Sequence, residues 1–307
     1  MEEKLFDKEF FEGIQRVKLA SNLKWNSGMG GLRKSAAKGS SVEFADFRDY
    51  IPGDDIRKID WNAFGRTNKL LVKLFHEEKE GSFHVLLDLS TSMEFGEQKK
   101  SLLAARLAGM FGHMVLQNMD RLHFYGFNSE NNYELKNLTG MQSLHKYLRC
   151  IESCTFGGRA ALLETVTHMP FHGKGVTILI SDFLDCGKTI EDRGDILQTL
   201  TGEMEAILKY LAYHKQEVIL VQVLAAEEVK PVLAGTVNLT DTETAEELRI
   251  TASPGIIRQY EKMLFTYQSM LQELCKKYRS YFLTARADEP MEKVIVEGIR
   301  KGQLVRI

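Results

Sequence analysis

The chain has 307 residues, of which 44% are hydrophobic and 27% are charged, and its formal net charge is −2. This composition is that of a globular protein with one or two domains. The near-neutral charge gives no general field that would recruit nucleic acid or an anionic membrane, so we expect neither as a partner.

No run of apolar residues approaches the roughly 20 needed to cross a bilayer, so we expect no membrane span. The first residues, Met1 to Phe6, lack the basic start and apolar middle of a secretory signal. We therefore expect a cytoplasmic protein, in which the four cysteines are free thiols.

The N-terminal quarter contains two kinds of sequence. Residues 3–22 carry an apolar stripe of Phe6, Phe10, Ile14 and Val17, which predicts a helix docked on the body of the protein. Residues 25–68 are rich in glycine and charge without periodicity, and we interpret them as ordered but irregular, with charges that pair internally. The predicted organisation is therefore an N-terminal region, 1–80, packed on a core formed by 81–307.

From residue 82 the pattern becomes regular. Short apolar segments alternate with helical patterns: strands at 83–88, 122–127, 176–181 and 217–224, and helices at 97–119, 141–151, 159–168 and 195–213. Strands that are apolar throughout and alternate with helices predict an α/β fold with a doubly wound, mainly parallel sheet and helices on both faces.

The C-terminal part departs from this alternation. Two short β patterns flank a polar turn, which predicts a small hairpin near 236–251. A long helical pattern follows at about 254–279, then a last strand at 281–284 and a short helix from Pro290.

Oxygen-bearing side chains follow two of the predicted strands. Asp88 ends one strand and is followed by Ser90 and Ser92, while Asp182 ends another. Ligands of open parallel sheets bind beyond the carboxyl ends of strands, and carboxylates with hydroxyls suit a hard cation such as Mg²⁺. The alternative is structural, because Asp and Ser also close turns and cap helices.

A family resemblance enters with these residues. The run from Asp88 to Ser92, followed by Met93, resembles the metal-ion-dependent adhesion site of von Willebrand factor A-like domains. The stretches 43–50, 53–62 and 71–73 resemble the signature of the bacterial family called domain of unknown function 58. The signature residues to which we assign a structural role are Arg48, Gly53, Asp54, Arg57, Asp60 and Trp61.

The resemblance implies a von Willebrand A-like sheet that carries the metal site. It also implies an association with MoxR-type AAA+ ATPases, which members of the family are thought to assist. Many members have N-terminal membrane helices, whereas this chain resembles the soluble subtype.

One position departs from the family pattern. The third metal-binding segment usually carries a threonine after two glycines, and here it reads Gly157-Gly158-Arg159. A positive charge near a cation repels it, so we expect weak Mg²⁺ binding or none. Arg159 could instead offer its guanidinium to a carboxylate of the partner, with Thr91 as a neighbouring partner contact.

No motif in the sequence places a nucleophile beside a base, and we interpret Glu227-Glu228 as a solvated loop. The leading hypothesis is a non-enzymatic adaptor that docks a protein partner at the site around Asp88. Two alternatives stay open. One is a metal-dependent hydrolase or phosphatase that uses Asp88 and Asp182, and the other is a purely structural scaffold.

Overall fold

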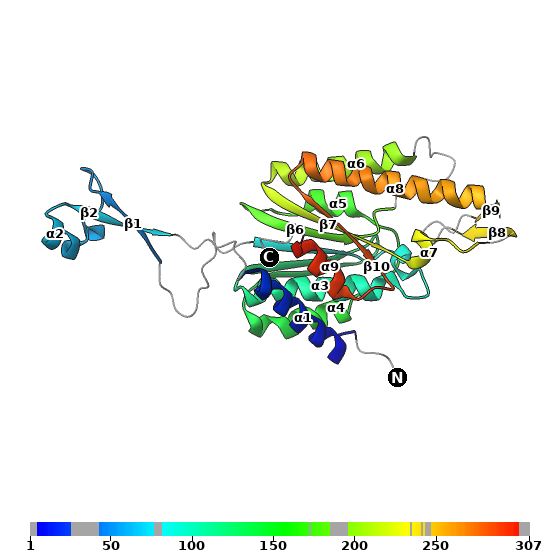
Figure 1. Cartoon of the computed structure of the whole chain (residues 1–307), viewed down its shortest axis with the longest axis horizontal. Coiled ribbons are helices and arrows are strands. Elements are labelled where there is room, and N and C mark those ends of the chain that lie inside the picture. Colours follow the sequence, from blue (N-terminus) through cyan, green and yellow to red (C-terminus); the bar gives the residue numbers. More distant parts are fainter. Residues whose placement is uncertain are drawn as a thin grey trace. The chain divides into compact units, whose positions relative to one another are not determined.

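The computed structural model describes residues 5–25, 43–76, 82–171, 173–184, 196–233, 235–240, 242 and 247–300. The chain divides into two compact units (Figure 1). Residues 1–29 and 81–307 form what we call the α/β unit, and residues 30–80 form the signature unit. The N-terminal helix thus belongs with the α/β unit and not, as predicted from the sequence, with a single region 1–80.

A six-stranded sheet forms the centre of the α/β unit, in the order β10-β7-β6-β3-β4-β5. Its strands are β3 (Ser82–Asp88), β4 (Arg121–Phe127), β5 (Asn132–Leu138), β6 (Gly175–Ser181), β7 (Gln216–Leu224) and β10 (Tyr281–Arg286). All neighbours pair in parallel except β4 and β5. The mainly parallel sheet predicted from the apolar strands is confirmed, since β3 is buried from its second residue to its last.

Helices cover both faces of this sheet (Figure 1). Each face has its own apolar core. One core includes α1 (Lys8–Trp25), α3 (Lys100–Gln117), α4 (Leu144–Glu152) and α9 (Met291–Arg300). The other includes α5 (Leu162–His168), α6 (Ile196–Tyr213) and α8 (Pro254–Lys277). This arrangement confirms the doubly wound α/β architecture.

Helix α1 is held on the α/β unit by its apolar stripe. Phe6, Phe10 and Ile14 are all buried in the core that α3 shares, and the rings of Phe6 and Phe10 lie 4.7 Å apart. A Cβ atom at Gly109 of α3 would lie 2.6 Å from the Phe6 ring, so the close approach requires glycine there. The predicted docking of this helix is therefore confirmed.

The tail of the α/β unit follows the sequence closely. Strands β8 (Gly235–Thr240) and β9 (Glu247–Ala252) form the expected antiparallel hairpin. Helix α8 begins with Pro254, and the Ser253 hydroxyl caps it by accepting a hydrogen bond from the Ile256 amide. In the described ranges, no helix combines the length and apolarity that a membrane crossing requires.

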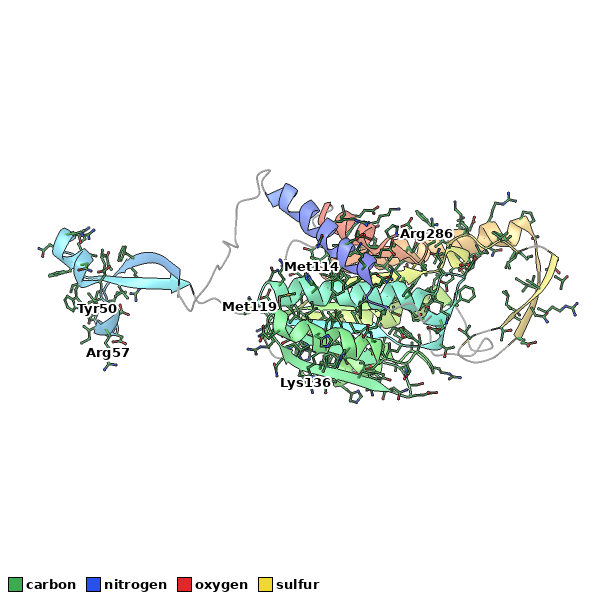
Figure 2. The ribbon with its side chains drawn as sticks, turned by 90° about the horizontal axis from the view of Figure 1, so that it is seen from below. Tyr50, Arg57, Met114, Met119, Lys136 and Arg286 are labelled. Atoms are coloured by element: carbon green, nitrogen blue, oxygen red, sulfur yellow. The ribbon has the colours of Figure 1, made fainter. Side chains whose placement is uncertain are left out.

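The signature unit is more regular than its sequence suggested. Strand β1 (Glu43–Asp49) pairs with β2 (Leu71–His76) in an antiparallel ribbon, and the short helices η1 (Ile56–Lys58) and α2 (Trp61–Thr67) connect them. The expectation of an irregular segment is therefore wrong for the described residues 43–68. Figure 2 labels Tyr50 and Arg57 on this unit.

Acidic residues of the signature organise the unit from within. Asp54 pairs with Arg48 at 2.9 Å and also accepts the Ile51 amide, while Gly53 adopts a φ of +109° in the same turn. Asp60 caps α2 through the amides of Asn62 and Ala63. Trp61 is 61% exposed, and Arg57 is exposed as well. That this unit packs on the core of the chain stays a prediction.

Candidate functional site

The candidate site lies where strand order reverses in the sheet. Strand β3 pairs with β4 on one side and with β6 on the other, where Leu87 lies beside Ile180. Such a switch point is where open α/β sheets bind ligands. Asp88 is the last residue of β3, and Asp182 directly follows β6, so the two predicted carboxylates end neighbouring strands.

The structure brings the four predicted metal-site residues into one hydrogen-bonded chain. Ser90 Oγ lies 3.0 Å from Ser92 Oγ, and Ser92 Oγ donates to Asp182 Oδ2 at 2.9 Å. Asp88 joins through the Ser90 amide, which donates to Asp88 Oδ1 at 2.9 Å. The four side chains therefore lie together at the strand ends, and their role as metal ligands stays a prediction.

Asp88 is fully buried, and its surroundings favour the neutral acid. Burial raises the pKa of Asp88 from 3.8 to about 6, and the nearby Asp182 charge adds to the increase. Hydrogen bonds from Ser181 Oγ at 2.5 Å and from Ser90 act in the opposite direction but do not cancel it. The carboxylate is thus held in a place where its charge is costly, which is typical of functional sites.

A buried lysine that was not predicted from the sequence also belongs to this site. Lys100, the first residue of α3, is fully buried, and its Nζ donates to Asp182 Oδ2 and Glu228 Oε1, each at 2.7 Å. Burial alone would lower the pKa of Lys100. The two carboxylates raise it by a larger amount, so the net shift is upward and the ammonium stays charged. A signal existed in the sequence, because Lys100 falls on the buried stripe of Leu103, Ala104 and Leu107.

Glu228 is the other partner of this lysine. It lies in the short helix α7 (Ala226–Val229), and its Oε2 accepts the Ala225 amide at 2.8 Å. Burial raises the pKa of Glu228, against the opposing effect of Lys100. The interpretation of Glu227-Glu228 as a solvated loop is therefore wrong for Glu228. Glu227 also makes a specific contact, since its Oε1 accepts the Glu97 amide at 3.0 Å.

The loop that carries Arg159 is held tightly against the site by its backbone. The amide and hydroxyl of Thr91 both donate to the Gly158 carbonyl at 3.0 Å, and the Gly157 amide donates to the Leu89 carbonyl at 2.8 Å. Gly158 has a φ of +65°, and a Cβ there would lie 2.6 Å from Ser129 Oγ, so this position requires glycine. Thr91 therefore joins two loops, while the Arg159 side chain is exposed at their edge.

The donor set does not fit a divalent cation in this arrangement. All four carboxylate oxygens of Asp88 and Asp182 accept hydrogen bonds from protein donors, including the Leu184 amide and the Lys100 ammonium. Among the residues that the structure describes, no group of three His, Cys, Asp or Glu side chains is placed to hold a metal. Mg²⁺ binding stays a prediction. The positive charge of Lys100 argues against it, because this charge would repel a bound cation.

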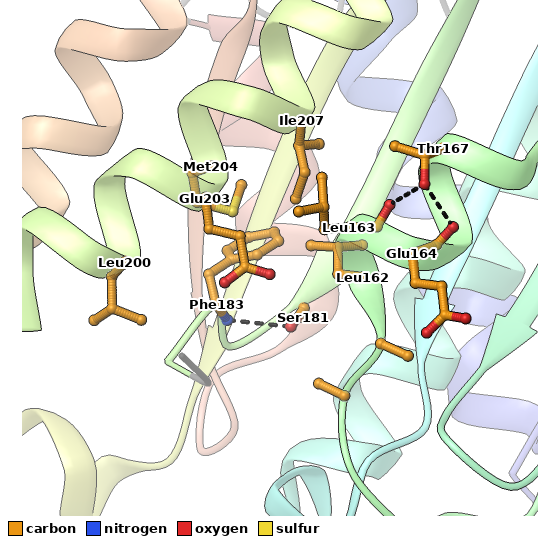
Figure 3. Close-up of a pocket in the computed structure, with 12 residues that line it drawn as sticks. Leu162, Leu163, Glu164, Thr167, Ser181, Phe183, Leu200, Glu203, Met204 and Ile207 are labelled. Atoms are coloured by element: carbon orange, nitrogen blue, oxygen red, sulfur yellow. Dashed lines mark hydrogen bonds between the residues drawn. The ribbon is translucent and has the colours of Figure 1, made fainter. Parts of the chain in front are cut away.

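An apolar cavity of about 500 Å³ adjoins the site. Leu163 on α5, Met204 and Ile207 on α6, and Phe183 after β6 contribute to its wall (Figure 3). Ser181 also lines it, and the same hydroxyl donates to Asp88. Ser181 therefore connects the wall of the cavity to the Asp88 carboxylate. A cavity of this size and apolarity is suited to an apolar group of a ligand or partner.

The comparisons with known proteins identify the family. Residues 46–268 match the family described as Protein of unknown function DUF58. The chain belongs to this family. The uncharacterized protein Rv1480 of Mycobacterium tuberculosis and its counterpart Mb1516 of Mycobacterium bovis are each 23% identical to this DUF58 chain over 308 residues. Each alignment covers 97% of this chain and 92% of the relative, so the similarity extends over nearly the whole of both chains.

Solved structures similar to this DUF58 chain include BatB from Bacteroides thetaiotaomicron, with 14% identity and a TM-score of 0.39. That match covers 72% of this chain and 98% of BatB. The SpRpn10 VWA domain is 8% identical with a TM-score of 0.41, covering 71% of this chain and 94% of the domain. Both TM-scores lie below 0.5, so the α/β assignment rests on the sheet topology of this chain.

Proposed function

We propose that this DUF58 protein is a non-enzymatic adaptor that docks a protein partner at the strand-end site. The observation that carries the proposal is the combination at one sheet edge of the exposed Arg159, the buried Asp88 network and the adjoining apolar cavity. Protein docking sites commonly combine an apolar anchor with a few positioned polar groups.

The hydrolase alternative receives less support from the geometry. A metal-dependent hydrolase needs a divalent ion between Asp88 and Asp182, and the buried Lys100 ammonium, 2.7 Å from Asp182 Oδ2, would repel such an ion. The scaffold alternative leaves the raised pKa of Asp88 without a use, because a purely structural site gains nothing from a buried and poorly compensated carboxylate.

The partner that we propose is a MoxR-type AAA+ ATPase, on the basis of the family resemblance. Its contact surface would present a carboxylate to Arg159, because a guanidinium pairs with a carboxylate through two parallel hydrogen bonds. An apolar side chain next to that carboxylate would enter the cavity, where Leu163 and Met204 contribute to the wall.

The test is a binding measurement between the purified chain and a purified MoxR-type ATPase from the same genome. Arg159→Glu reverses the charge at the site and should weaken binding by about tenfold or more, the usual range for a buried interfacial charge. Arg279→Glu is the matched control, since Arg279 is exposed and precedes β10 at the opposite edge of the sheet. Equal binding by wild type and Arg159→Glu would refute the docking site.

A further inference from the structure

Lys100 occupies a place that lysine seldom takes. Its side chain is wholly buried, and a buried ammonium is destabilising unless carboxylates pair with it. The preceding residue shows the ordinary arrangement, because Lys99 is exposed and pairs with Glu94 at the surface. A lysine at the first position of α3 does not need to enter the core, so its burial calls for a role at the site.

The ammonium of Lys100 acts on the predicted metal site through one oxygen. Asp182 Oδ2 accepts from Lys100 Nζ at 2.7 Å and from Ser92 Oγ at 2.9 Å. The positive charge therefore lies next to the hydroxyl and carboxylate that a strand-end cation would need. A divalent ion bound to the same groups would lie a few ångströms from this ammonium, and the two like charges would repel.

Several elements fix the position of this charge. Glu228 holds Nζ from α7, while Asp182 holds it from the end of β6. Glu228 is itself fastened by the Ala225 amide, and α7 is tied to the loop before α3 through Glu227. Lys100 cannot leave the site without breaking this network, so its charge is a permanent part of it.

We propose that Lys100 is the resident cation of this strand-end site and takes the place of a divalent metal ion. A consequence for docking, which rests on the function proposed above, is that the partner binds without Mg²⁺. The protein supplies the neutralising charge itself. Lys100 is a positioning residue in this scheme, since it acts on the site through Asp182 and has no exposed surface for a partner.

The test is a titration with Mn²⁺, followed by the electron paramagnetic resonance signal of the free ion. Wild type should show no saturable site that depends on Asp88. Lys100→Met removes the charge and keeps an unbranched apolar chain, so this variant should show a saturable Mn²⁺ site with an affinity at least about tenfold above the upper limit measured for wild type. The gain should disappear when Lys100→Met is combined with Asp88→Asn. Lys99→Met is the matched control and should behave as wild type.

A merely structural ion pair would not produce this gain of metal affinity. An Asp88-dependent Mn²⁺ site in wild type that is as tight as the one in Lys100→Met would overturn the proposal. If circular dichroism shows that Lys100→Met does not fold, wild type and Lys100→Arg decide: an Asp88-dependent site in both overturns the proposal, and its absence in both supports it.

Docking provides a separate readout. Binding of the ATPase to wild type that is unchanged by a chelator supports a resident cation, and docking that requires Mg²⁺ at this chain overturns it. Failure of the docking proposal can be recognised independently. Equal binding of the ATPase by wild type and Arg159→Glu would refute the docking site, and it would not change the Mn²⁺ result.

Discussion

Replacement of Asp88 by asparagine should stabilise the metal-free protein at neutral pH. The carboxylate is fully buried, and its pKa in the folded state is about 6, against 3.8 when it is not perturbed. Because the folded pKa is the higher one, folding favours the protonated acid. The contribution of Asp88 to stability is complete below pH 3.8 and is lost as the pH rises through 6.

The size of the effect follows from these two values. A difference of about two pH units corresponds to roughly 3 kcal/mol of unfolding free energy, at 1.36 kcal/mol per unit. Asparagine is neutral throughout this range and nearly isosteric with the acid, and it keeps one acceptor oxygen for the Ser90 amide. Asp88→Asn should therefore unfold with a free energy about 1–3 kcal/mol above that of wild type at pH 8 and no higher at pH 4.

The assay is urea denaturation of the wild type and of Asp88→Asn at several pH values, with a chelator present. Glu273→Gln is the control, since Glu273 is exposed on α8 and pairs only at the surface with Lys276. Its difference from wild type should stay near zero. If Asp88→Asn is less stable than wild type by the same amount at pH 4 and pH 8, the buried charge is not costly and the reasoning fails.

Two further predictions concern the packing of α1 and the role of the apolar cavity. Phe10→Ala should lower the unfolding free energy of the α/β unit by about 3–5 kcal/mol in urea denaturation, because Phe10 is fully buried and its removal leaves a cavity; a loss below about 1 kcal/mol would contradict the assignment of α1 to this unit. Ala161→Trp should place an indole in the cavity beside Ser181 and weaken ATPase binding by about tenfold, with the melting temperature little changed. Unaltered binding by Ala161→Trp would show that the cavity lies outside the interface.

Much of the sheet could be predicted because parallel strands are buried on both faces. The continuous apolar runs that became β3, β6 and β7 are the local result of that burial. Strand β5 was not predicted, because it is an antiparallel edge strand that is exposed at most positions and has no continuous apolar run; its only sequence signal is the polar–apolar alternation from Asn132 to Lys136. Strand β1 was missed because charged residues occupy four of its seven positions without a regular alternation.

The candidate site was only partly accessible to sequence reasoning. Asp88 and Asp182 could be paired because both end apolar strands, and neighbouring strand ends lie close together. Lys100 falls on the buried stripe of α3, but it was missed because lysine at a helix start is usually solvated and its partner Glu228 is 128 residues away. Only tertiary packing, which places α7 beside the start of α3, reveals why this lysine is buried.

The central claim is that a partner binds at the strand-end site, and photo-crosslinking tests it most directly. A photoreactive amino acid is placed at position 159 and, in a second variant, at position 279 on the opposite edge of the sheet. With the ATPase present, the account predicts a crosslink from position 159 and none from position 279. A crosslink from position 279 alone would contradict it.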